Sequence, residues 1–140
     1  MVIVLHNLKQ EPDAPGHYIG RARRDEPHNP LGNPFLLGRD GDRDEVCNKF
    51  DRKMWDLVRR AVSKGCHVTE DERLILMKLS ELWHILRREK ELHLLCFCAP
   101  ERCHGLTVRA VIEWLERELG PGLTESQAWA YQFYRGLQPR

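Results

Sequence analysis

The segment from residue 92 to residue 119 constrains the fold more than any other part of the chain. Residues 92–98 (LHLLCFC) are a dense apolar run, which predicts a buried strand in the centre of a sheet. Pro100 breaks that strand, and apolar residues at helical spacing predict a helix from about residue 103 to the glycine at position 120. A strand that passes directly into a helix is typical of α/β folds.

The rest of the chain also alternates between strand and helix signals. Strands are expected at residues 2–5 and 17–20, and a long irregular loop rich in Gly, Pro, Asn and Arg is expected over residues 21–41. The sequence therefore predicts an α/β fold, a small Rossmann-like layer sandwich with a short, mostly parallel sheet and flanking helices. Two of these helices are expected to begin at capping boxes, which pair Asp42 with Glu45 and Thr69 with Glu72.

A single domain is expected to take up most of the chain. The 140 residues are too few for two domains that would each fill a core, and no disulfide or metal is needed for stability at this size. We place one α/β domain over residues 1–120 and a helical extension over residues 121–140. Aromatic residues at helical spacing in the extension, Trp129 and Phe133, predict that it packs on the domain or joins two subunits in a homo-oligomer.

Charge and hydropathy narrow the range of partners. The formal net charge is +1, which excludes a strongly cationic nucleic-acid binder and gives no attraction to an anionic membrane surface. A local basic patch is compatible with this balance, so nucleic acid as a partner stays open. No apolar run has the length of a membrane span, and the first residues lack the pattern of a secretion signal. We therefore expect no membrane partner and a cytoplasmic protein.

A cluster of cysteines lies where the central strand passes into the last helix. The odd number of cysteines, five, predicts reduced thiols rather than a disulfide framework. Ligands of open α/β sheets bind at this carboxyl edge, and a helix start attracts anions. The first interpretation is therefore an anion site in which Cys103 is a nucleophile or His104 a general acid or base. The helix start, His104 or Arg102 would lower the pKa of Cys103, and Gly105 would let a ligand approach the backbone.

Two other interpretations of the cluster stay open. In the first, Cys96, Cys98, Cys103 and His104 bind zinc in a non-enzymatic module, although four ligands so close together lack the two separated pairs of most structural zinc sites. In the second, the cysteines are small buried apolar residues. The cofactor is accordingly unknown, with zinc as the alternative.

Three motifs together resemble a known family. They are Tyr18-Ile19-Gly20-Arg21, then LGNPF over residues 31–35, then CFCAP over residues 96–100 followed by Cys103-His104-Gly105. The chain resembles a phage and bacterial domain-of-unknown-function family with a YIGR, LGNPF and CWCAPxxCHG pattern, over roughly residues 2 to 119. Phe97 stands where the family usually has Trp. The resemblance implies a compact α/β fold with a site at these motifs, and it implies no established activity.

The earlier motifs supply further candidate ligand-binding residues. Arg21 can bind a phosphate through two hydrogen bonds, and Asn33 lies in a tight turn that can present its amide. Tyr18 or Phe35 would stack on an aromatic ligand. If these loops converge on the helix start, they form one polar pocket with Cys98, Cys103, His104 and Gly105. The leading hypothesis is a protein that binds a nucleotide or other phosphorylated small molecule, with modification of nucleotides or nucleic acids as its reaction. The alternatives are the zinc module and a protein-interaction module.

Overall fold

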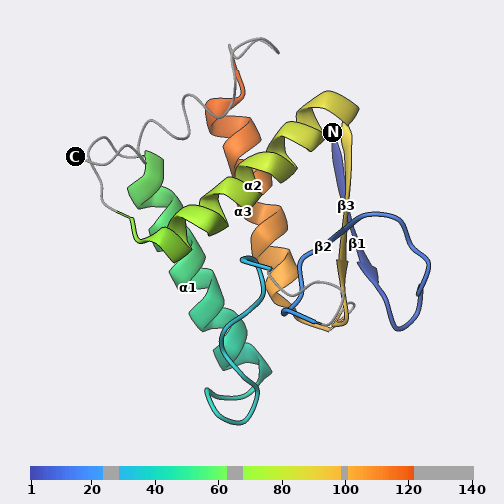
Figure 1. Ribbon diagram of the computed structural model, residues 1–140, viewed down its shortest axis with the longest axis vertical. Coiled ribbons are helices and arrows are strands. Elements are labelled where there is room, and N and C mark those ends of the chain that lie inside the picture. The colour runs from blue at the N-terminus through green and yellow to red at the C-terminus, as the bar shows by residue number, and fades with distance from the viewer. Residues whose placement is uncertain (24–28, 63–67, 99–100, 122–140) are drawn as a thin grey trace.

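A computed structural model of the chain describes residues 1–23, 29–62, 68–98 and 101–121. The small α/β fold is confirmed, with three strands, three helices and a parallel sheet in the order β1-β3-β2 (Figure 1). Most of the expected C-terminal extension, residues 122–140, lies outside the described residues. The elements are β1 (Val2–Asn7), β2 (His17–Tyr18), α1 (Arg43–Val62), α2 (Glu70–Glu89), β3 (Glu91–Cys96) and α3 (His104–Leu119).

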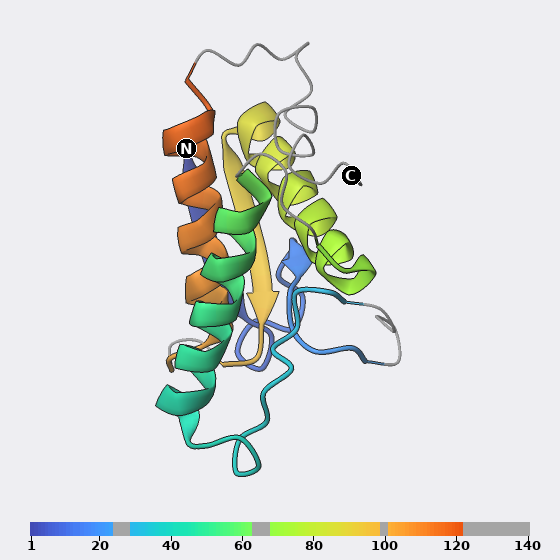
Figure 2. The same cartoon turned by 90° about the vertical axis from the view of Figure 1, so that its left-hand side faces the viewer.

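The apolar strand β3 is central, as its composition predicts. Its register on β1 runs from Val2 opposite Glu91 to Asn7 opposite Cys96, and the two residues of β2 pair on its other side. All three helices lie on one face of the sheet (Figures 1 and 2). This arrangement differs from a doubly wound sheet, which carries helices on both faces.

The two faces of the sheet are buried to different extents because side chains alternate along a strand. Alternate residues of β3 enter the main core under the helices, and Leu95 on the opposite face belongs to a small cluster with Leu8 and Tyr18. The continuous apolar run at residues 2–5 is typical of a strand buried on both faces, and this prediction is wrong for β1. Val2 is 56% exposed, because none of the three described helices covers the outer face (Figure 1).

The helix starts follow their predicted caps. Asp42 and Glu45 exchange hydrogen bonds between side chain and backbone at the start of α1, and Thr69 does the same with Glu72 at the start of α2. The run of charged residues at 87–91 predicts a turn, but α2 continues to Glu89. Lys90 alone makes the turn into β3, with a left-handed backbone at φ 64°.

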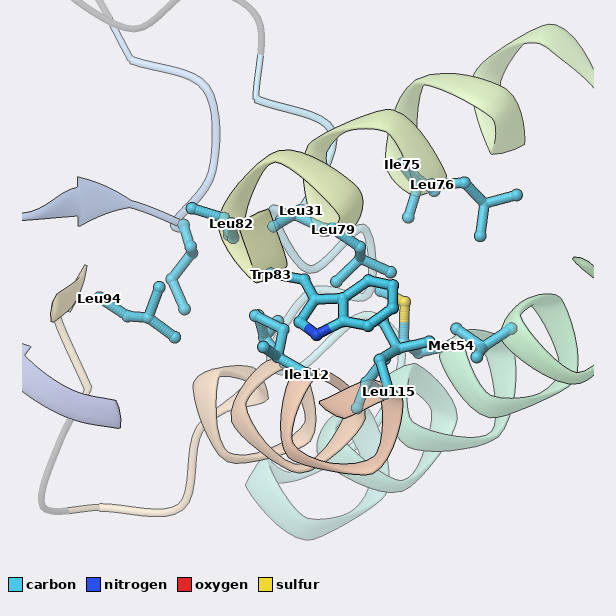
Figure 3. Packing of buried hydrophobic residues seen from close by; sticks show 14 of the residues in the cluster. Leu31, Met54, Ile75, Leu76, Leu79, Leu82, Trp83, Leu94, Ile112 and Leu115 are labelled. Atoms are coloured by element: carbon cyan, nitrogen blue, oxygen red, sulfur yellow. The ribbon is translucent and has the colours of Figure 1, made fainter. Parts of the chain in front are cut away.

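Trp83 is the centre of the main core. Its side chain is fully buried, and Figure 3 shows the indole of Trp83 between side chains of all three helices. The indole N–H donates to Glu116 at 2.8 Å, and Arg87 pairs with the same carboxylate. The polar end of this large side chain is therefore satisfied inside the helical layer. Within the described residues, no helix combines the length and the apolar character needed to cross a membrane.

Candidate functional site

A pocket of about 480 Å³ lies at the carboxyl ends of the strands. This is the edge at which open α/β sheets bind ligands, and the volume falls within the range of small-molecule sites. We call it the site pocket. It is lined by Asn7, Lys9, Gln10, Tyr18, Gly20, Arg21, Asn33, Leu37, Arg43, Val46, Cys47, Phe97, Cys98, Glu101, Arg102, Cys103 and His104.

The structure brings together most of the candidate residues from three distant parts of the chain. Those that line the site pocket are Tyr18, Arg21, Asn33, Cys98, Cys103 and His104. Two candidates do not line it. Cys96 is fully buried behind the pocket, and Gly105 lies in the first turn of α3 against the sheet. Phe35 also packs against the core rather than lining the pocket.

The residues of the two earlier motifs brace one another. The Arg21 side chain donates to the carbonyl oxygens of Asn33 and Phe35 at 2.9 and 2.8 Å, and the Tyr18 hydroxyl donates to the Arg21 carbonyl at 2.8 Å. The Asn33 side chain accepts from the N–H of Phe35 and donates to the carbonyl of Val46. Many of the hydrogen-bonding groups of the Arg21 and Asn33 side chains thus stabilise the loop that forms the pocket wall. Arg21 nevertheless lines the site pocket and adds its positive charge to the pocket wall.

Cys103 and His104 form the start of α3. The Cys103 sulfur caps the helix by accepting from the Gly105 N–H at 3.2 Å. His104 Nε2 lies 2.6 Å from the Ile19 carbonyl oxygen, which can only accept, so Nε2 carries the proton. The other ring nitrogen, Nδ1, faces the Cys103 sulfur at 3.7 Å. Burial lowers the pKa of His104, so the ring is neutral near pH 7. Both nitrogens point to protein atoms, which favours a positioning role over proton transfer to a ligand.

The pKa values of the Cys98 and Cys103 thiols differ from the sequence-based expectation. Hydrogen bonds from Cys103 to Cys96 and Cys98, together with burial, raise the pKa of Cys103. The expectation that the helix start lowers this pKa is therefore wrong, because Cys103 is 3% exposed and acts as the donor. The hydrogen bond from Cys103, with a second from Arg43, lowers the pKa of Cys98 to about 6. Of the two thiols, Cys98 is therefore the one on which a negative charge is favoured near pH 7.

Cationic side chains dominate the lining of the site pocket. Besides Arg21, the pocket is lined by Lys9, Arg43 and Arg102, and Glu101 is its one acidic lining residue among those the structure describes. Arg43 pairs with Glu101 at 2.8 Å and donates to the Arg102 carbonyl at 3.3 Å.

Sequence reasoning named Arg102 only as a group that would lower the pKa of Cys103, and it did not name Lys9 or the aromatic ring of Phe97 as part of a ligand site. The available signal for Arg102 was its position inside the CFCAPxxCHG motif. Lys9 lies two residues beyond β1 and carried no such signal.

The first turn of α3 is less available to an anion than its position suggests. The N–H of Gly105 donates to the Cys103 sulfur, and the N–H of Leu106 donates to the Cys103 carbonyl oxygen. A methyl group on Gly105 would lie 3.2 Å from side-chain carbons of both Ile19 and Leu5. Gly105 therefore serves the close packing of α3 on the sheet, rather than the approach of a ligand as expected.

The zinc alternative gains no support from the described side chains. Over residues 1–23, 29–62, 68–98 and 101–121, no group of three or more His, Cys, Asp or Glu residues could hold a metal ion. The observed hydrogen bonds explain why: His104 is turned toward the Ile19 carbonyl, and Cys103 caps α3.

Comparison with known proteins gives a family and no activity. No characterised protein and no solved structure matched the chain. A family model described as domain of unknown function DUF4326 matches residues 4–114, which include both loops and the CFCAPxxCHG segment. The expectation of a family of unknown function is confirmed to that extent. Since the match spans most of the α/β domain, the chain belongs to the DUF4326 family.

Proposed function

We propose that this protein binds a nucleotide or another phosphorylated small molecule in the site pocket. One observation carries the proposal: four lining side chains are cationic and one is acidic, in a pocket of about 480 Å³ at the carboxyl edge of a parallel sheet. In a chain whose net charge is only +1, such a local excess of positive charge favours an anionic ligand.

Two arginines are the best candidates to hold the phosphate. Arg102 donates to the Asp44 carboxylate at 3.1 Å and to the Asn48 side chain at 2.7 Å, and Arg43 is fixed by Glu101. These contacts hold both guanidinium groups before a ligand arrives, so little side-chain entropy is lost on binding. Lys9 is exposed and adds a third cation at the pocket wall.

An aromatic ring at the pocket favours a ligand with a flat ring, such as a nucleobase. Phe97 is 36% exposed and lines the site pocket, and its ring packs edge-on against Tyr18 with centroids 5.9 Å apart. The fixed Phe97 ring offers a face on which a base can stack, which contributes about 1–3 kcal/mol where measured by alanine substitution. A nucleotide, with a phosphate for the arginines and a base for Phe97, would use both features. Modification of a nucleotide or nucleic acid is the reaction class that we favour.

Calorimetric titration tests this proposal. Nucleoside monophosphates should bind, and the matching nucleosides should bind at least tenfold more weakly, because they lack the group that the arginines hold. The variant Arg102→Gln should weaken the nucleotide by a similar factor, about 1.4 kcal/mol.

The matched control for this titration is Arg109→Gln. It removes the same charge from a residue that pairs with Glu113 on α3 and does not line the pocket. Equal binding of nucleoside and nucleotide, or equal losses in the two variants, would contradict a phosphate site in the pocket.

A further inference from the structure

Cys98 combines exposure, charged neighbours and a position in the pocket wall. Its thiol is half-buried and lines the site pocket together with Cys103, Arg43 and Arg102, and two hydrogen-bond donors, the Cys103 thiol and the Arg43 guanidinium, lower its pKa. Both donors favour a negative charge on this sulfur. The other described thiols nearby are buried and therefore less suited to such a role, since Cys47 is 5%, Cys103 3% and Cys96 0% exposed.

We propose that Cys98 is the nucleophile of the site pocket and forms a covalent bond with an electrophilic carbon of an anionic ligand. This inference rests on the proposed function for the anionic character of the ligand. It reassigns the nucleophile from Cys103, the candidate favoured by the sequence, to Cys98. Cys103 becomes a positioning residue that acts through its hydrogen bond.

The contacts around Cys103 explain why its proton stays in place. Its sulfur caps α3 and lies beside His104, whose ring is fixed by the Ile19 carbonyl. Cys103 can therefore donate to Cys98 without moving, and burial disfavours a charge on Cys103 itself. The surroundings of these two sulfurs thus favour Cys103 as a hydrogen-bond donor and Cys98 as the thiol that loses its proton.

The step balances in atoms and charge. Cys98 releases its proton to the solvent that fills the pocket, and the polarizable sulfur then attacks the carbon. The S–C bond forms while the bond from that carbon to its leaving group breaks, and the leaving group departs with the bonding electron pair. Arg43 and Arg102, which line the same pocket as the sulfur, hold the anionic group of the ligand.

Alkylation of the full chain tests Cys98 directly. We would treat the protein with iodoacetamide from pH 5 to 9 and follow each cysteine peptide by mass spectrometry. Cys98 should react before Cys47, whose pKa is raised by burial, and its rate should rise with a midpoint near pH 6. The midpoint is a sharper readout than the rate at one pH, because a thiolate of low pKa is also intrinsically less nucleophilic.

Variants of Cys103 separate positioning from folding. Cys103→Ala should move the midpoint for Cys98 upward by about one pH unit or more, whereas Cys103→Ser keeps a donor and a cap and should retain most of the effect. A purely structural role of Cys103 would change stability in both variants and leave the midpoint alone. A midpoint above pH 8 in the wild-type protein, or a Cys98 no more reactive than Cys47, would overturn the proposal.

A charged reagent separates this proposal from the proposed function. Iodoacetate carries a carboxylate where iodoacetamide is neutral, so the ratio of their rates at Cys98, divided by the same ratio in urea-unfolded protein, reports the local positive charge. We expect this quotient to exceed about three and to fall in Arg102→Gln, where one cation of the pocket is lost. Rapid reaction with iodoacetamide and a quotient near one would support the nucleophile and overturn the anion-binding pocket. Nucleotide binding by calorimetry with an unreactive Cys98 would do the reverse.

Discussion

Gly105→Ala distinguishes two explanations of the glycine at the start of α3, namely close packing and ligand approach. The added methyl carbon would lie 3.2 Å from Ile19 Cδ1, 3.2 Å from Leu5 Cδ2 and 3.3 Å from the Cys103 sulfur. Carbon atoms pack best at about 3.5–4.0 Å, so the neighbours must each move by a few tenths of an ångström. Both hydrocarbon neighbours belong to the interface between α3 and the sheet, which leaves little room for relaxation.

The expected net cost of Gly105→Ala is about 1–2 kcal/mol. Overpacking of a tight interior costs about 1–3 kcal/mol, and replacing a helical glycine by alanine returns up to about 1 kcal/mol. Urea unfolding monitored by tryptophan fluorescence would measure the change in the free energy of unfolding. Because Gly105 does not line the site pocket, nucleotide affinity per folded molecule should stay nearly unchanged.

A double-mutant cycle with Ile19→Val tests the stated contact. This change removes Ile19 Cδ1, one of the two carbons nearest the new methyl group, and alone should cost about 0.5–1.5 kcal/mol. The double variant should be destabilised by less than the sum of the two single-variant costs, and the difference should be at least about 0.5 kcal/mol. Additive costs, or a Gly105→Ala variant as stable as the wild type, would refute the packing argument. A selective loss of nucleotide binding would instead restore the explanation by ligand approach.

Three further predictions concern stability. Leu79→Ala, at a fully buried position beside Trp83, should lower the free energy of unfolding by about 2–5 kcal/mol in urea titration, and a loss below 1 kcal/mol would contradict the described core. Thr69→Ala should cost about 1 kcal/mol by removing the cap on the Glu72 N–H, whereas Thr69→Ser should restore most of it. Burial lowers the pKa of His104, so below its ordinary value of 6.5 the unfolded chain binds more protons than the folded protein, and stability falls as the pH drops from about 6.5 to 5. The variant His104→Gln should show a smaller fall in the free energy of unfolding over that range. An unchanged pH dependence in this variant would argue against a neutral buried ring.

The sequence predicts the local elements well because their signals are local. The capping boxes at Asp42 and Thr69 lie within four residues of the groups they bond, and the apolar run around Leu94 identifies the central strand without its partners. The exposure of Val2 was not predicted, since it depends on which face of the sheet the helices cover. That choice is made by packing between elements far apart in the chain, and a single strand does not encode it.

The sequence predicts which motif residues line the site pocket, but it does not predict which of the thiols has the lowered pKa. Motif residues such as Tyr18 and Cys98 could be assigned to one pocket because parallel strands end at one edge. The charge on the sulfurs depends on which thiol donates to which, and that depends on the depth of Cys103 in the fold and on the reach of Arg43 from α1. Neither quantity can be read from spacing along the chain.

The central position of β3 has a consequence for how the chain assembles. Strand β1, which precedes the other described elements in the chain, has hydrogen-bonding partners on β3 alone in the described sheet, with Val2 opposite Glu91. During synthesis β1 cannot pair with β3 until α1 and α2 have been made, because both helices precede β3 in the chain. Pairing of β1 with β3 then closes a very long loop. Folding of the isolated chain should therefore be slow for its size, with the helical pair α1–α2 available early and the sheet completed last.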